Sequence, residues 1–300
     1  MSARQDLIAA NGRKEEDLIL RVPAKINLWL EVVGKRENGY HDLSSLMLPV
    51  SVFDRITVGV RPGREGISIS CDTSEIPSDE RNLAWRAAQL YLQAGAIRAG
   101  VDIGIEKRIP WGAGLGGGSS DAAGVLCALN SFFENPVAPA ELHALALALG
   151  ADVPFFLDSR PALATGIGEK LEFTRSAPAY QLLLIKPPIS VPTAWVYQSL
   201  KLTKRAAQIK LASFEERPYQ LGDLIENDLE TVTVPRYPVI AEIKRWLIGK
   251  GALAASMSGS GPTVFGIFKT GGAAADAAGM ARVEWSDCWV HTARVIEGKD

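Results

Sequence analysis

A glycine-rich stretch is the part of the sequence best suited to chemistry. Glycines let a backbone approach a polyphosphate closely and aim its N–H groups at it, and a helix that follows adds the positive end of its dipole. The two serines at its end can cap the helix, bind phosphate oxygens or hold a magnesium ion. The pattern predicts a phosphate loop, formed by Pro110, Trp111, Gly112, Ala113, Gly114, Leu115, Gly116, Gly117, Gly118, Ser119 and Ser120.

Three other interpretations of this stretch are weaker. A flexible linker seldom lies between a strand and an apolar helix. Gly112, Gly114 and Gly117 fit the dinucleotide-binding pattern G-x-G-x-x-G of dehydrogenases, but Lys107 and Pro110 stand between the preceding strand and the first glycine, which that pattern places at the strand end. A Walker A loop needs Gly-Lys-Ser or Gly-Lys-Thr, and neither follows these glycines.

Two charged residues lie in apolar surroundings, where burial is costly unless a charge is paired. Lys25 follows Pro23 and Ala24, and Asp152 lies between Ala151 and Val153. In phosphoryl transfer a carboxylate accepts the hydroxyl proton while a cation stabilises charge on the transferring group. The residues alone leave two interpretations open: a catalytic pair, or a structural ion pair or two unrelated solvated charges.

Other polar residues are less specific. His41 follows Gly39-Tyr40, which presents an aromatic ring beside an imidazole; this suits a nucleobase or sugar ring as well as ordinary packing. Asp121 would complement the dipole of the helix after the glycines, so it receives no catalytic role. The turn Ser258–Pro262 would be read as a plain hairpin turn if it stood alone.

Composition and charge narrow the function classes. The formal net charge of -2 provides no basic field for nucleic acid or for an anionic membrane. The odd set of three cysteines, Cys71, Cys127 and Cys288, favours neither a disulfide framework nor a zinc site. The first twenty residues are charged and contain no apolar signal core, and no later run has the length of a membrane helix. We expect a cytoplasmic protein with no nucleic-acid or membrane partner.

Strand and helix patterns alternate along the chain and predict an α/β (α+β) fold of two domains, residues 1–165 and 166–300. Pro23 to Asn27 are expected to interrupt the first strand region. Asn82 is expected to cap the helix that begins there, and a serine is expected to cap the helix after the glycines. Strands are predicted at 18–22, 27–33, 55–60, 67–71, 101–105, 182–186, 252–257, 263–268 and 288–295, and helices at 82–94, 119–133, 141–149, 224–229, 239–249 and 273–281.

Three segments together resemble the signature motifs of the GHMP kinase superfamily in order and spacing: Pro23-Ala24-Lys25-Ile26-Asn27, the stretch 110–120, and Ser258-Gly259-Ser260-Gly261-Pro262. Further segments are similar to the branch of that superfamily that phosphorylates a cytidine-diphosphate-linked alcohol in non-mevalonate isoprenoid biosynthesis. They are Gly39-Tyr40-His41, the triple glycine before Ser119, and 150–156. The resemblance covers the chain from about residue 20 to about residue 295.

The resemblance implies ATP as phosphoryl donor, with Mg²⁺, and a small-molecule alcohol as acceptor. It implies that Asp152 is the catalytic base, that Lys25 is its charged partner at the acceptor hydroxyl, and that 110–120 bind the ATP phosphates. It also implies a two-domain kinase fold with a left-handed βαβ crossover in its N-terminal domain. The residues implied at the cytidine end of the substrate are Asn27, Tyr40, His41 and Tyr197.

Two alternatives stay open at this point. One is another alcohol kinase of the same superfamily, acting on homoserine or mevalonate, and the other is a ligand sensor without activity on the same scaffold. A sensor is expected to lose the lysine or the aspartate, and both Lys25 and Asp152 are present. The sequence specifies neither the magnesium ligands nor the oligomeric state.

Overall fold

The structure is a computed structural model that describes residues 16–174, 177–201, 221 and 225–296. These residues form two compact units. Unit 1 comprises 16–23, 53–111 and 117–158, and the described parts of 24–52, 112–116 and 159–296 form unit 2. Each unit is therefore assembled from separate stretches of the chain. The division into domains 1–165 and 166–300 stays a prediction, and most of the N-terminal leader lies outside the described residues.

Two long strands pass through both units. They are β1 (Glu16–Lys35) and β2 (His41–Pro62), which pair with each other. The predicted break in the first strand was wrong, because β1 continues through Pro23. A proline is tolerated in an edge strand, and backbone groups here find partners away from the sheet ladder. The Pro23 carbonyl accepts a hydrogen bond from the Ser120 hydroxyl at 2.7 Å, and the Lys25 N–H donates to the Leu115 carbonyl at 2.9 Å.

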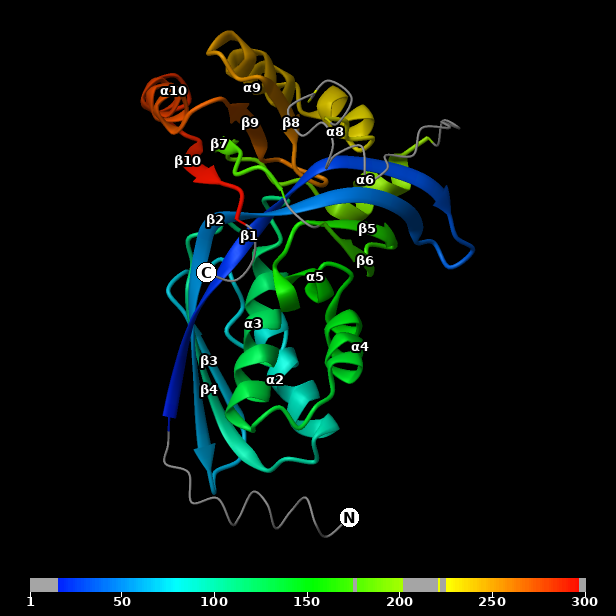
Figure 1. The fold of residues 1–300 in the computed structure, drawn as a ribbon, viewed down its shortest axis with the longest axis vertical. Helices are drawn as coiled ribbons and strands as arrows, with labels where there is room; N and C mark the ends of the chain where they lie inside the picture. Colours follow the sequence, from blue (N-terminus) through cyan, green and yellow to red (C-terminus); the bar gives the residue numbers. More distant parts are fainter. Residues whose placement is uncertain (1–15, 175–176, 202–220, 222–224, 297–300) are drawn as a thin grey trace. The chain divides into compact units, whose positions relative to one another are not determined.

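Unit 1 contains a parallel β-α-β connection covered by helices. The second half of β2 pairs antiparallel with β4, and β3 pairs parallel with β4 on its other side. Figure 1 shows the helices of this unit on one side of these strands. The elements are β3 (Ile67–Cys71), α2 (Leu83–Ala94), β4 (Ala99–Glu106), α3 (Gly117–Phe132), α4 (Pro139–Leu149) and α5 (Val153–Asp158).

Small residues bring α3 close to the strands of unit 1. A side chain at Gly124 would lie 2.5 Å from a methyl group of Ile56 and 2.6 Å from one of Val22, so only glycine fits there. Ala122 and Ala123 are fully buried beside it. Alternate residues of β4, among them Val101 and Ile103, are buried as the period of two in a strand requires. The core of unit 1 therefore fixes the direction in which α3 begins.

Unit 2 contains two sheet regions. The first half of β2 pairs antiparallel with β5, and β5 with β6. Four antiparallel strands in the order β10-β7-β9-β8 form the other region. The elements are β5 (Ala162–Gly166), β6 (Lys170–Phe173), β7 (Gln181–Lys186), α6 (Thr193–Ser199), α8 (Glu230–Arg236), α9 (Val239–Gly249), β8 (Ala254–Met257), β9 (Val264–Phe268), α10 (Gly271–Glu284) and β10 (Trp289–Arg294).

The hydrophobic core of unit 2 lies between the four-stranded sheet and helices α9 and α10 (Figure 1). Leu183 and Ile185 of β7 contribute from the sheet, Leu247 from α9 and Ala278 from α10. Residues of β1, including Leu30 and Val32, join the same cluster. This packing anchors the strand that carries Lys25 and Asn27.

Most predicted elements are present with shifted ends, and two further predictions were wrong. Asn82 caps α2 as expected, since its side chain accepts from the Ala84 N–H at 2.9 Å. Helix α3 begins at Gly117 rather than at a serine, and the Ser120 hydroxyl bonds to Pro23 instead of capping. In place of the helix predicted at 224–229, the described residues 225–229 form a turn and a β-bridge between Asn227 and Leu30.

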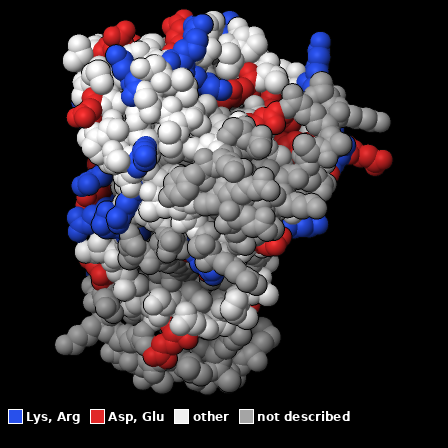
Figure 2. Space-filling view, turned by 45° about the horizontal axis from the view of Figure 1, so that its top comes forward, with Lys and Arg blue, Asp and Glu red and all other residues white. Residues whose placement is uncertain are grey.

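Among the described residues, none of the helices is long and apolar enough to cross a membrane. On the face drawn in Figure 2, acidic and basic side chains are interspersed over the described part of the chain. This mixture agrees with the nearly balanced composition.

Candidate active site

Lys25 and Asn27 lie on one face of β1, because alternate residues of a strand point to the same side. Both are buried, with exposures of 4% and 5%. The Lys25 ammonium donates to the Asn27 amide oxygen at 2.7 Å, and the Asn27 NH₂ donates to the Ser45 hydroxyl at 2.8 Å. Ser45 in turn donates to the Trp29 carbonyl at 2.7 Å. The amide orientation of Asn27 is thus fixed from both ends.

The turn Ser258–Pro262 joins β8 to β9 and reaches the same place. The Ser258 hydroxyl accepts from the Asn27 N–H at 3.4 Å and donates to the Gly114 carbonyl at 2.9 Å. A side chain at Gly259 would lie 3.3 Å from the Asn27 amide oxygen and 3.5 Å from the Lys25 ammonium. The third motif therefore packs directly against the polar pair of the first.

Residues 112–116 of the predicted phosphate loop complete this convergence within unit 2. The carbonyls of Ala113, Gly114 and Leu115 accept hydrogen bonds from Thr263, Ser258 and Lys25. Among the hydrogen bonds within the described residues, none uses the N–H of Gly114, Leu115 or Gly116. With the carbonyl side of the loop bound to protein, its N–H groups are left for a ligand. This is the arrangement that a polyphosphate requires.

The glycines of the loop are required by its geometry. Gly112, Gly114 and Gly116 have φ of +61°, +74° and +73°, a region that other residues seldom adopt. A side chain at Gly114 would also collide with the Ser258 carbonyl. The residues present thus fit the triphosphate of ATP, since an anion can approach the backbone without meeting a side chain.

The rest of the predicted loop belongs to unit 1. Trp111 is 59% exposed, and Gly117 to Ser120 form the first turn of α3. Ser120 is buried and its hydroxyl is committed to Pro23, whereas Ser119 is half-buried. Ser119 is therefore the more exposed of the two serines.

Asp152 is positioned by a turn between two helices of unit 1. Gly150 ends α4, the Val153 N–H donates to the Gly150 carbonyl at 3.1 Å, and α5 begins at Val153. Asp152 is half-buried. Lys25 belongs to unit 2, so the pairing of these two residues stays a prediction.

Three of the residues predicted at the cytidine end lie in the first part of unit 2 and in α6. His41 is buried and packs against Tyr197, with ring centroids 5.4 Å apart and an angle of 31° between the rings. Tyr40 is 58% exposed after the turn at Gly39. Burial, and then the charge of Lys35, lowers the pKa of His41, so its ring is neutral at pH 7 and offers one donor and one acceptor. The fourth residue, Asn27, lies beside Lys25 on β1 and accepts its hydrogen bond.

Comparison with known proteins decides the family. Residues 82–160 match the family described as GHMP kinases N terminal domain, and residues 209–285 match GHMP kinases C terminal. The 4-diphosphocytidyl-2-C-methyl-D-erythritol kinase of Geobacter sulfurreducens is 46% identical over 276 residues, which are 92% of this chain and 99% of the relative. The kinase of the same name from Syntrophotalea carbinolica is 48% identical over 85% of this chain and 91% of its own.

The chain belongs to the GHMP kinases.

Solved structures agree with this assignment. A crystal structure of 4-(cytidine 5'-diphospho)-2C-methyl-D-erythritol kinase superposes with a TM-score of 0.80 at 38% identity, covering 92% of this chain and 99% of the other. A homoserine kinase from Cytophaga hutchinsonii has a TM-score of 0.74 at 18% identity, which indicates a shared fold only. The predicted family and the two-domain GHMP kinase fold are confirmed.

In this GHMP kinase, sequence reasoning missed a residue that holds the third motif. Asn227 is buried, and its NH₂ donates to the carbonyls of Met257 at 2.7 Å and Gly259 at 2.8 Å, on either side of Ser258. Its amide oxygen accepts from the Leu229 N–H at 3.0 Å. The adjacent Asn-Asp pair was a turn signal that the helical interpretation of 224–229 overlooked.

Family membership implies ATP and leaves the metal to be assigned. The described residues contain no group of three or more His, Cys, Asp or Glu side chains that could hold a metal ion.

Proposed function

We propose that this protein transfers the γ-phosphoryl group of ATP to the 2-hydroxyl of 4-diphosphocytidyl-2-C-methyl-D-erythritol. The observation that carries the proposal is the convergence of the first motif, residues 112–116 and the third motif around Lys25 in unit 2. The two relatives that share 46% and 48% identity over most of the chain bear the name of this kinase. ATP supplies the phosphoryl group, and Mg²⁺ would neutralise charge on its phosphates.

The proposed step assigns a role to each predicted residue. Asp152 accepts the proton of the acceptor hydroxyl, while the oxygen forms its bond to the γ-phosphorus. The bond between that phosphorus and the β,γ-bridging oxygen breaks, and ADP departs with the electron pair. Lys25 stabilises the developing negative charge at the acceptor oxygen and the phosphoryl group. The N–H groups of 114–116 and the first turn of α3 hold the phosphates in place.

An acceptor panel tests the function. The purified protein is incubated with ATP and Mg²⁺ and with the cytidylyl alcohol, homoserine or mevalonate, and ADP and the phosphorylated product are measured. We expect the cytidylyl alcohol to be phosphorylated with the highest kcat/KM. More efficient phosphorylation of either simple alcohol would contradict the substrate assignment, and binding of ATP without turnover on any acceptor would favour a sensor.

The role of Asp152 is tested by Asp152→Asn, which keeps the shape and removes the base. Turnover should fall by ~10²–10⁴-fold with an unchanged fold, since this is the usual contribution of a positioned base. Asp158→Asn is the matched control, because Asp158 is an exposed acid on α5 and should keep wild-type turnover. Near-wild-type turnover of Asp152→Asn would remove it from the mechanism.

The cytidine end is tested by separating stacking from hydrogen bonding. Tyr40→Ala should weaken the binding of cytidine and uridine analogues alike, because stacking on a base contributes about 1–3 kcal/mol whatever the base. His41→Ala should reduce the ratio of the affinities for the cytidine and uridine analogues, because a neutral imidazole contacts the polar edge of the base. Calorimetry with both analogues checks this, and an unchanged preference in His41→Ala would exclude it from base selection.

A further inference from the structure

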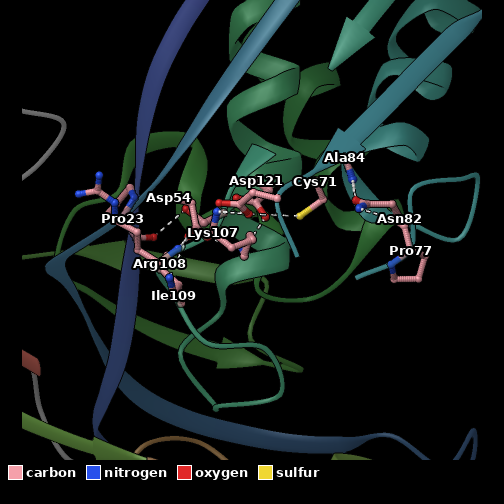
Figure 3. Close-up of polar contacts among 12 residues, drawn as sticks. Pro23, Asp54, Cys71, Pro77, Asn82, Ala84, Lys107, Arg108, Ile109 and Asp121 are labelled. Carbon is pink, nitrogen blue, oxygen red and sulfur yellow. Dashed lines mark hydrogen bonds and ion pairs between the residues drawn. The ribbon is translucent and has the colours of Figure 1, made fainter. Parts of the chain in front are cut away.

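A cluster of buried charges in unit 1 lies at both ends of the phosphate loop (Figure 3). Asp54 of β2 is completely buried, Asp121 of α3 is nearly so, and the Lys107 side chain is 7% exposed. The Lys107 ammonium pairs with Asp54 and, at 2.8 Å, with the Asp121 Oδ2 atom. Sequence reasoning gave none of these three residues a structural partner; it treated Lys107 as a spacer and Asp121 as a complement to the helix dipole.

Asp54 holds the chain where it enters the loop. Its Oδ1 atom accepts from the N–H groups of Arg108 at 2.6 Å and Ile109 at 2.8 Å, directly before Pro110. The Lys107 N–H donates to the Asp72 carboxylate at 2.9 Å. Three consecutive N–H groups at the entry are therefore bound by carboxylates, two by the buried Asp54 and one by the exposed Asp72.

Lys107 connects this entry to the exit of the loop. Its ammonium lies 3.2 Å from the position that a side chain at Gly117 would occupy, and it pairs with Asp121 one turn further along α3. Gly117 is the first residue of that helix. A single side chain thus contacts both the strand side and the helix side of the loop.

Stability alone does not account for such a cluster. Replacing a buried ion pair by well-packed apolar residues is often neutral or stabilising, so the presence of this cluster is weak evidence for a role in stability. The Asp121 Oδ1 atom is buried without a hydrogen-bond partner among the described residues, which adds a cost. An arrangement that is costly and specific indicates a function at this position.

We propose that Asp54, Lys107 and Asp121 form a buried clamp that fixes both ends of the phosphate loop and so positions its N–H groups for ATP. The clamp rests on the proposed function, because it assumes that residues 110–120 bind the phosphates. Lys107 and its partners are positioning residues, and Asp121 sets the net charge of the clamp beside the first turn of α3. With both carboxylates ionised the clamp carries one net negative charge, and protonation of Asp121 removes it.

The surroundings allow Asp121 to change its charge near neutral pH. Burial raises the pKa of Asp121 to about 7, although the ammonium of Lys107 opposes the rise. Burial also acts to lower the pKa of Lys107, but the charges of Asp121 and Asp54 outweigh it and hold the pKa above its ordinary value. The remaining facing groups are Cys71 and Asp72 at the end of β3, and the pKa of the Cys71 thiol is raised, chiefly by burial.

Asp121→Asn tests the charge of the clamp without changing its shape. The affinity for a nonhydrolysable ATP analogue with Mg²⁺ is measured by calorimetry at pH 6 and pH 8. A charge at the first turn of a helix changes anion binding by about two- to fivefold, so wild-type affinity should fall by that factor between the two pH values while that of Asp121→Asn stays flat. The matched control is Glu106→Gln, which removes an exposed acid one residue before Lys107 and should follow wild type.

Lys107→Met tests the clamp itself, and Lys107→Arg is the conservative rescue. We expect Lys107→Met to weaken binding of the ATP analogue at least tenfold, to raise the KM for ATP, and to leave the affinity for the cytidylyl alcohol unchanged. Lys107→Arg should recover most of this loss. If Lys107→Met does not fold, the comparison of Lys107→Arg with Asp121→Asn still tests the clamp. Both of these variants keep a buried cation beside Asp54.

Each outcome separates the clamp from the proposed function. Wild-type protein that binds the analogue, together with a Lys107→Met variant of unchanged affinity or an Asp121→Asn variant with the wild-type pH profile, overturns the clamp alone. An equal loss of affinity for ATP and for the alcohol also overturns it, since the residue would then be merely structural. Wild-type protein that does not bind the analogue overturns both proposals.

Discussion

Two glycine-rich segments of this GHMP kinase are held in different ways. The turn Ser258–Pro262 is held by neutral groups, because Asn227 binds the carbonyls on either side of Ser258. The two ends of the phosphate loop are held by charges, through Asp54, Lys107 and Asp121. The neutral latch of Asn227 fixes one turn, whereas the charged clamp connects a strand to a helix across the loop between them.

The neutral contacts of Asn227 and the charged contacts of the clamp differ in how they respond to pH. An amide offers two donors and one acceptor whose strength does not depend on pH, so the latch is constant over the physiological range. A clamp with two carboxylates for one ammonium carries net charge, and burial brings one carboxylate to a pKa of about 7. Of these two sets of contacts, the clamp is the one whose charge changes near neutral pH.

The largest effect is expected from removing the cation of the clamp. Lys107→Met leaves two buried carboxylates without their partner, and breaking a buried pair in this way lowers the free energy of unfolding by about 3–5 kcal/mol. Urea denaturation measures it, with Lys170→Met on the exposed face of β6 as the control. Asp121→Asn added to Lys107→Met should restore part of the loss, because one uncompensated charge is removed. If Lys107→Met lowered the free energy of unfolding by less than Asn227→Ala does, the charged contacts would not hold their segment more strongly than the neutral ones.

A smaller effect is expected from the neutral latch. Asn227→Ala removes three hydrogen bonds and leaves the buried carbonyls of Met257 and Gly259 without this donor, which should cost about 2–3 kcal/mol. Asn227→Asp keeps the acceptor for Leu229 and loses both donors, so it separates the two contributions. Denaturation at a single pH suffices. Equal stability of Asn227→Ala and wild type would show that the turn holds without the latch.

Short local motifs supplied most of the candidate site residues, whose roles stay predictions. The glycines of 112–118 could be found because so many glycines between a strand and a helix have few other uses, whereas Lys25 and the turn 258–262 gained a specific meaning only in combination with them. The Asn82 cap and the exact bounds of α9, Val239–Gly249, followed from helix periodicity and stop signals. The family and fold were inferred from these motifs in combination, and the comparisons confirmed them.

Contacts between distant segments were beyond such reasoning. Asp54 precedes Lys107 by 53 residues, and Asn227 precedes Gly259 by 32, so no window of sequence contains either pair. Asp121 looked like a surface acid at a helix start, because its burial depends on how closely α3 packs on the strands. The helix predicted at 224–229 failed for a related reason: the β-bridge of Asn227 to Leu30 overrides the local pattern.

The smallest effect concerns the pH dependence of stability, and it separates the two devices most sharply. The pKa of Asp121 is about 7 in the folded protein and near its ordinary 3.8 in the unfolded chain. The folded protein therefore holds a proton that the unfolded chain has lost, and the stability contributed by protonated Asp121 declines as pH rises through 7. Lys107 and Cys71 keep their protons in this range, because their pKa values are raised from 10.5 and 9.0.

Between pH 6 and pH 8 the free energy of unfolding should fall by about 1 kcal/mol more in wild type than in Asp121→Asn. Asn227→Ala should keep the wild-type slope at a lower stability. Urea denaturation of the three proteins at pH 6, 7 and 8 measures these slopes, and a wild-type slope in Asp121→Asn would mean that the clamp does not titrate in this range.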